Sequence, residues 1–212
     1  MDKRKQVVVT EDQSATLLDK VYGYVLNGIP KMEKPITELV REYTSKYNST
    51  EDAIKEFVRV QRLKVTTTGF LTGLGGLIVL PVALPADLVS STYIELRTIA
   101  AIAAIRGYSV NDDKVKTMVY FCLVGNAIGD VLKQAGIKIG EAYVAKKLIP
   151  KVSTEVSKKL TRAVGVRVLT KGGSKGIINL GKLVPVVGGV VGGIYNYVEI
   201  SVFARRAKRF FE

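Results

Sequence analysis

The stretch that decides the fold is VTTTGFLTGLGGLIVLPVALPADLVSSTYIELRTIAAIAAIR, residues 65–106. The 22 residues between Lys64 and Asp87 carry no formal charge, and they include four glycines and two prolines. A helix rich in Ser, Thr and Ala follows, and we expect it to end at Arg106-Gly107, because glycine is the usual C-terminal cap of a helix. The pattern predicts an apolar helical hairpin that the rest of the chain covers.

This hairpin does not have the pattern of a transmembrane helix. A helix that spans a bilayer needs about 20 apolar residues, whereas Pro81 and Pro85 interrupt the stretch, because proline lacks an N–H and clashes with the preceding turn. The roughly 15 helical residues before Pro81 reach about 22 Å, less than the hydrocarbon core of about 30 Å. A buried or re-entrant hairpin is favoured, and insertion of residues 65–106 or 183–198 into a bilayer stays open.

Helical periodicity dominates the remaining chain. Thr10 and Gln13 form the pattern of a capping box, Ser49 is a good N-cap, and a second helix without charge lies between Lys182 and Glu199. Glycines four residues apart predict close helix–helix contacts in a membrane or a soluble bundle; the pairs are Gly69/Gly73, Gly125/Gly129, Gly136/Gly140, Gly188/Gly192 and Gly189/Gly193.

These patterns predict one all-α domain, a single helical bundle with glycine-rich apolar helical hairpins packed inside amphipathic helices. Its parts are a basic N-terminal arm (1–10), amphipathic helices (11–64), an apolar glycine-rich core (65–135), a basic region (136–182), and an apolar helix with a basic tail (183–212).

Composition excludes several kinds of site. The chain has no histidine and one cysteine, which excludes Ser-His and Cys-His catalytic pairs, an intramolecular disulfide and a structural zinc site. Cys122 lies in the apolar run MVYFCLVG, so we expect a buried, unreactive thiol. GLGGL at 73–77 lacks the Lys-Ser/Thr of a phosphate loop. We predict no catalytic residue, no metal and no cofactor. No secretory signal opens the chain, which indicates an intracellular protein.

The net charge of +13 is concentrated in one region. Residues 133–182 hold 12 Lys/Arg and only two acidic residues, a composition that attracts phosphate-bearing partners. Tyr143 is the only aromatic residue there, and no nucleic-acid-binding motif is visible, so anionic lipid is preferred to nucleic acid. The predicted lipid-binding residues are Lys146, Lys147, Lys151, Lys158, Lys159, Arg162, Arg167, Arg205, Arg206, Lys208 and Arg209.

Isolated charges in apolar helical segments predict a second kind of site. Asp87 either stabilises the N-terminus of its helix or joins Arg97 and Asp130 in a buried network, because buried charges must pair. Asn126 lies one turn before Asp130 and is placed to join by a hydrogen bond. Two carboxylates also allow acid–base chemistry, the basis of a distant hydrolase alternative.

Residues 69–108 contain three motifs in a fixed order, GF-x-TGLGG, LP-x-x-LPADL and R-x-IA-x-IA-x-x-x-GY. This order of motifs resembles the EcsC protein family. CLVGNAIGDVLKQAG (122–136), VPVVGGVVGGIYNYV (184–198) and the closing ARRAKRFF extend the resemblance over roughly residues 50–212. The resemblance implies a bacterial α-helical protein and carries over no catalytic residues. It places shared polar positions at Asp87, Arg97, Asp130 and Asn196.

Together these observations predict a membrane-associated, non-enzymatic protein that binds anionic phospholipid surfaces through its basic region. We expect it in the cytoplasm, peripheral to the inner face of the cell membrane, with integral insertion left open. The alternative is a soluble carrier of a lipid or another hydrophobic ligand within the bundle. A homo-oligomer and a membrane protein partner are further partners that the sequence leaves open.

Overall fold

The structure is a computed structural model of the chain that describes residues 6–8, 10–66, 78, 86–124, 128–134, 144–169, 177–179 and 189–212. Inside these ranges, the side chains of residues 6–8, 86–87, 128, 131, 134, 167, 169, 177–179 and 189–196 are outside the description. Apart from Gly129 and the backbone of 189–193, the glycine pairs that predict close helix contacts therefore lie beyond what is described.

The described chain is an all-α bundle, as predicted, with one short pair of strands added. The helices are α1 (Glu11–Asn27), α2 (Ile36–Lys46), α3 (Thr50–Thr66), α5 (Ala86–Ile105), α6 (Asp113–Val124), α7 (Ile128–Gln134), α8 (Ala145–Leu148), the 3-10 turn η3 (Ile149–Lys151), α9 (Thr154–Leu169) and α10 (Gly189–Phe210). The strands β1 (Gln6–Val8) and β2 (Ile177–Asn179) pair antiparallel, with Val7 opposite Ile178. The all-α prediction did not include this pair.

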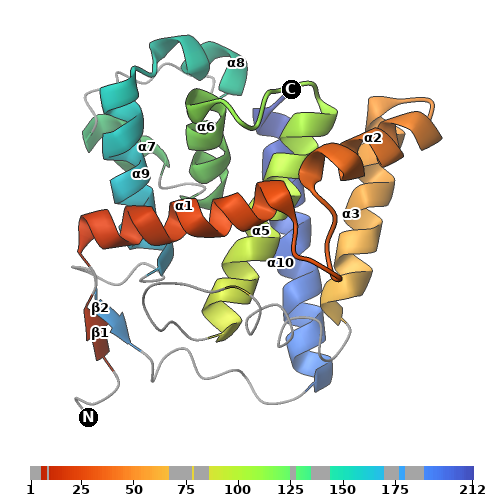
Figure 1. Cartoon of the computed structure of the whole chain (residues 1–212), viewed down its shortest axis with the longest axis horizontal. Helices are drawn as coiled ribbons and strands as arrows, with labels where there is room; N and C mark the ends of the chain where they lie inside the picture. Colours follow the sequence, from red (N-terminus) through yellow and green to blue (C-terminus); the bar gives the residue numbers. More distant parts are fainter. Residues whose placement is uncertain are drawn as a thin grey trace.

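The long helices α3, α5 and α10 pack together: in Figure 1, α5 and α10 lie side by side, and α3 packs against α10. Helix α1 crosses in front of α5 and also contacts α9, which packs against α6. Helices α3 and α10 run antiparallel, because Glu51 contacts Lys208 at one end and the Arg62 guanidinium lies 5.1 Å from the Tyr197 ring centroid toward the other.

Helix α5 is the core helix. Among the described residues, its window Leu88–Ile105 is the one stretch long and apolar enough to cross a membrane, with a mean hydropathy of 1.4. Within the protein 83% of that window is buried, by packing against α1, α2, α3, α6 and α10. Length and composition therefore give only weak evidence of a membrane span, because the central helix of a bundle has the same properties.

Local signals at the helix ends mostly hold. Thr10 and Gln13 form the predicted capping box, Ser49 accepts a hydrogen bond from the Asp52 amide (3.1 Å), and Gly107 follows α5 with φ 87°. Helix α1 ends at Asn27, because Gly28 adopts φ 75°, and a β-carbon there would lie 2.3 Å from the Glu33 carbonyl oxygen.

A glycine and a cysteine inside helices show how closely the helices pack. Gly165 lies inside α9, where a β-carbon would come within 2.8 Å of the Ser14 carbonyl carbon. Gly165 therefore allows α1 and α9 to cross at close range. Cys122 is 4% exposed, so the predicted burial of this cysteine is confirmed. Burial also raises the pKa of the Cys122 thiol.

Candidate functional site

A surface made by α8, η3 and α9 gathers most of the exposed positive charge that was predicted. Residues 144–169 contain seven Lys/Arg and one acidic residue, Glu155. Helix α9 buries one stripe at positions 157, 160, 161, 164 and 165, the spacing of one helix face, so its cations point outward. The exposed Lys and Arg side chains of these elements are here called the basic surface; they are Lys146, Lys147, Lys151, Lys158, Lys159 and Arg162.

Four of the six cations of the basic surface have no acidic partner among the described residues. Lys159 pairs with Glu155 (Nζ–Oε1 3.1 Å), and Arg162 pairs with Asp12 of α1 (Nε–Oδ1 2.6 Å). No described residue forms an ion pair with Lys146, Lys147, Lys151 or Lys158. Arg167, also predicted to bind lipid, lies on α9 with its side chain outside the description. The surface therefore presents unneutralised charge to solvent.

The basic tail is partly engaged in the fold. Arg205 and Arg209 are exposed on α10, whereas the half-buried Arg206 places its guanidinium 5.4 Å from the Phe203 ring centroid. Lys208 binds Glu51 (Nζ–Oε2 2.8 Å), and this hydrogen bond lowers the pKa of Glu51. Figure 1 shows the C-terminus at the same end of the molecule as α8. The exposed tail arginines therefore extend the charge at that end.

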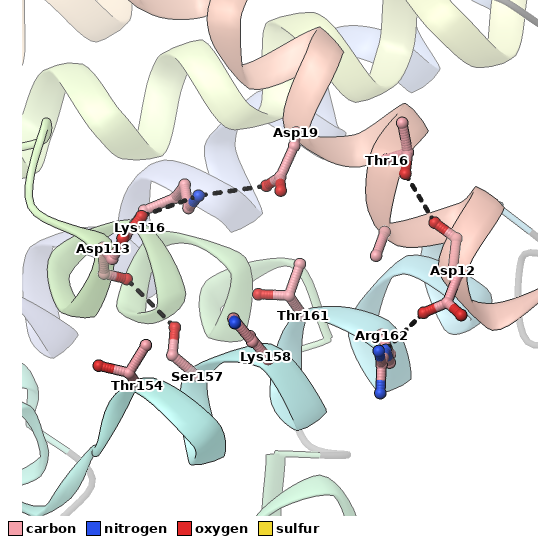
Figure 2. Close-up of a pocket in the computed structure, with 11 residues that line it drawn as sticks. Asp12, Thr16, Asp19, Asp113, Lys116, Thr154, Ser157, Lys158, Thr161 and Arg162 are labelled. Carbon is pink, nitrogen blue, oxygen red and sulfur yellow. Dashed lines mark hydrogen bonds and ion pairs between the residues drawn. The ribbon is translucent and has the colours of Figure 1, made fainter.

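A polar cleft of about 290 Å³ lies beside the basic surface, between α1, α6 and α9 (Figure 2). Its charged lining is balanced, with the three carboxylates of Asp12, Asp19 and Asp113 and the three cations of Lys116, Lys158 and Arg162. Ala15 and four hydroxyl side chains, of Thr16, Thr154, Ser157 and Thr161, complete the lining. Sequence reasoning missed this cleft, because its residues come from three separate helices.

Ion pairs hold the walls of the cleft together. Lys116 of α6 bridges Asp113 (3.0 Å) and Asp19 of α1 (3.4 Å), and Tyr120 donates a hydrogen bond to Asp19 (2.7 Å). Burial lowers the pKa of Lys116, but the contacts with Asp113 and Asp19 outweigh burial, so that its pKa lies above the ordinary value. The hydroxyls of Thr117 and Ser157 share a hydrogen bond between α6 and α9. The walls are thus fixed to one another.

One face of α9 brings groups without partners into this cleft. Thr154, Lys158 and Thr161 are spaced four and three residues apart, so they follow one face of the helix. Their side chains make no hydrogen bond or ion pair with any described residue, although Thr161 is only 6% exposed. In Figure 2 no dashed line reaches the Lys158 amine. The Lys158 amine and the hydroxyls of Thr154 and Thr161 are therefore available to a ligand in the cleft.

The residues that surround buried Arg97 differ from those predicted for the buried network. Arg97 is 1% exposed, and its guanidinium contacts the Glu33 carboxylate (3.2 Å) and donates to the carbonyls of Val25 (3.1 Å) and Lys34 (2.7 Å). Glu33, which also binds Lys64 (2.8 Å), was not predicted. It lies in the loop sequence KMEKP, whose charges resemble those of an exposed turn, and nothing in the sequence indicates its burial.

Asp130 corrects the predicted network. It is exposed on α7, because the buried position of that helix is Leu132, and it therefore cannot form a buried pair with Arg97. Asp87 and Asn196 lie on α5 and α10 with side chains outside the description, and Asn126 lies outside the described residues.

Comparison with known protein families identifies the chain. The family model described as the EcsC protein family matches residues 9–212. The chain belongs to the EcsC protein family. The match with the EcsC model takes in every described helix, and so both the basic surface and the cleft, and leaves out β1. No curated protein and no solved structure matches the chain.

Proposed function

We propose that this EcsC protein is a non-enzymatic peripheral membrane protein that binds anionic phospholipid surfaces. The observation that carries the proposal is the set of cations on α8, η3 and α9 that lack acidic partners among the described residues, Lys146, Lys147, Lys151 and Lys158. A lysine near an anionic bilayer surface contributes about 1 kcal/mol, so four of them contribute about 4 kcal/mol, or about a thousandfold in affinity.

The arrangement favours a flat anionic surface over a small anion. The lysines are distributed over three successive elements, α8, η3 and α9, and the C-terminus, which follows the exposed Arg205 and Arg209, lies at the same end of the molecule as α8 (Figure 1). A bilayer rich in acidic lipid supplies many negative charges over such an area. Because its cytoplasmic leaflet carries the anionic lipid, the proposed location is the inner face of the cell membrane.

Flotation of detergent-free protein with lipid vesicles tests the proposal. The protein is mixed with vesicles that contain or lack acidic phospholipid, at low and at high salt. We expect flotation only with acidic lipid, and release at high salt, because salt screens exposed charges beyond about 10 Å at 0.1 M.

Two results would overturn this mode of binding. Flotation that resists salt with every lipid would show insertion of apolar segments in place of surface attraction. Protein that stays at the bottom of every gradient would contradict membrane binding, and the soluble carrier of a hydrophobic ligand would take its place.

A further inference from the structure

We infer that the cleft between α1, α6 and α9 is a binding site for a phosphate ester that also carries a primary ammonium group, the chemistry of an ethanolamine-type phospholipid head group. The inference deepens the proposed function, because it names the head group that would enter beside the basic surface. It rests on the charge balance of the cleft and on the groups there that lack partners.

The phosphate half of the ligand has a place on α9. Lys158 offers an unpaired ammonium, and the hydroxyls of Thr154 and Thr161 follow on the same helix face. Thr161 is more than nine-tenths buried, yet its hydroxyl has no partner among the described residues. Phosphate oxygens accept charge-assisted hydrogen bonds from lysine and ordinary ones from hydroxyls, so a phosphate satisfies all three groups.

The ammonium half has a place on the opposite walls. Asp12, Asp19 and Asp113 each use Oδ1 in their contacts with Arg162, Lys116 and Tyr120. A carboxylate has two oxygens and several lone pairs, so each aspartate can accept a further hydrogen bond from a primary ammonium. The ion pairs orient the carboxylates along the walls of the cleft.

The net charge of the lining distinguishes this ligand from a simple anion. Three carboxylates and three cations line the cleft, so their formal charges sum to zero. A purely anionic ligand would gain attraction from Lys158 and repulsion from the aspartates. A group with both charges matches both walls, whereas the basic surface outside has no such balance and prefers acidic lipid.

The test uses the full chain and a water-soluble probe, glycerophosphoethanolamine, followed by calorimetry or by NMR shifts. We expect saturable binding that weakens about tenfold or more in Lys158→Ala, because a charge-assisted hydrogen bond is lost. Thr161→Val, which removes the hydroxyl at nearly constant volume, should weaken binding several-fold. The control Lys55→Ala changes an exposed lysine of α3, outside both the cleft and the basic surface, and should bind like the unchanged protein. Thermal unfolding verifies that each variant is folded.

A second arm identifies the source of the ligand. Vesicles of constant acidic lipid content, made with phosphatidylethanolamine or phosphatidylcholine, are compared in flotation. A preference for ethanolamine lipid that is lost in Lys158→Ala supports a lipid head group, because choline has no N–H to donate. Binding of the soluble probe without a lipid preference supports the same site for a free phosphate ester. Absence of probe binding, or binding that ignores both Lys158→Ala and Thr161→Val, overturns the inference. The soluble arm contains no membrane, so its failure is distinct from failure of the proposed membrane binding.

Discussion

Helices α3 and α9 carry similar numbers of cations, but they use them differently. Residues 50–66 contain four Lys/Arg and three Asp/Glu, whereas residues 154–169 contain four Lys/Arg and one Glu. On α3, Arg59 pairs with Glu56, and Lys64 pairs with Glu33. On α9, Lys158 has no partner among the described residues. Lys64 of α3 thus connects elements of the fold, as Arg162 of α9 does through Asp12 of α1, whereas Lys158 of α9 is left without an acidic partner among the described residues. The comparison teaches that pairing, and not the number of lysines, separates a structural charge from one that can bind.

The largest expected effect tests the structural side of this comparison. Arg97→Met should destabilise the protein by about 3–5 kcal/mol, because it removes a cation beside the buried Glu33. Urea unfolding measures the loss. The double variant Arg97→Met/Glu33→Gln should recover part of it, because the buried carboxylate, which would keep only Lys64 as a partner, is replaced by a neutral amide. A loss below about 1 kcal/mol for Arg97→Met would show that this pair does not hold α5 against the α1–α2 loop.

A smaller effect tests how the basic side is attached to the bundle. Gly165→Ala should destabilise by about 1–3 kcal/mol, because the new β-carbon would overlap the Ser14 backbone where α9 crosses α1. The matched control is Gly23→Ala in α1, where a β-carbon meets nothing within 4 Å. That change should stabilise by about 0.5–1 kcal/mol through helix propensity. Equal effects of the two changes, measured by thermal or urea unfolding, would refute the close crossing.

The smallest effect concerns pH. The hydrogen bond from Lys208 lowers the pKa of Glu51 below its ordinary value of 4.5, so the stability from this pair is present above that value. It is lost as the pH falls through the lower folded-state pKa. Both side chains are substantially exposed, so the contribution is about 0–1 kcal/mol. Unfolding of wild type and Glu51→Gln should differ at pH 7 and converge below pH 4.5. A difference that grows in acid would have the wrong sign.

The sequence predicted what depends on neighbouring residues and missed what depends on long-range packing. The capping box at Thr10 and the glycine turn after Arg106 are local signals, and both are present. Glu33 meets Arg97 across 64 positions of the chain, and no local pattern distinguishes it from a loop carboxylate. The same limit applies to Asp130, which lies in an apolar run but on the exposed side of α7.

The candidate site also has a part that the sequence could predict and a part that it could not. The exposed lysines of α8 and α9 follow from composition and helical spacing, so the basic surface was predictable. The cleft requires α1, α6 and α9 to lie together, which periodicity cannot give. The role of Arg162 also depends on this packing, because it pairs with Asp12 of α1 in addition to lying on the basic surface.

The central claim, that unpaired cations of α8, η3 and α9 bind anionic membranes, is tested most directly by two variants of equal net charge. The first variant changes the four unpaired cations, Lys146, Lys147, Lys151 and Lys158, to Glu. The second changes four exposed cations elsewhere, Lys20, Arg41, Lys46 and Lys55, to Glu. Each variant falls from +13 by 8 charges to +5. We predict that flotation with acidic vesicles is lost in the first, retained in the second, and that both unfold like the wild type. Equal loss in both variants, or retention in the first, would contradict the claim.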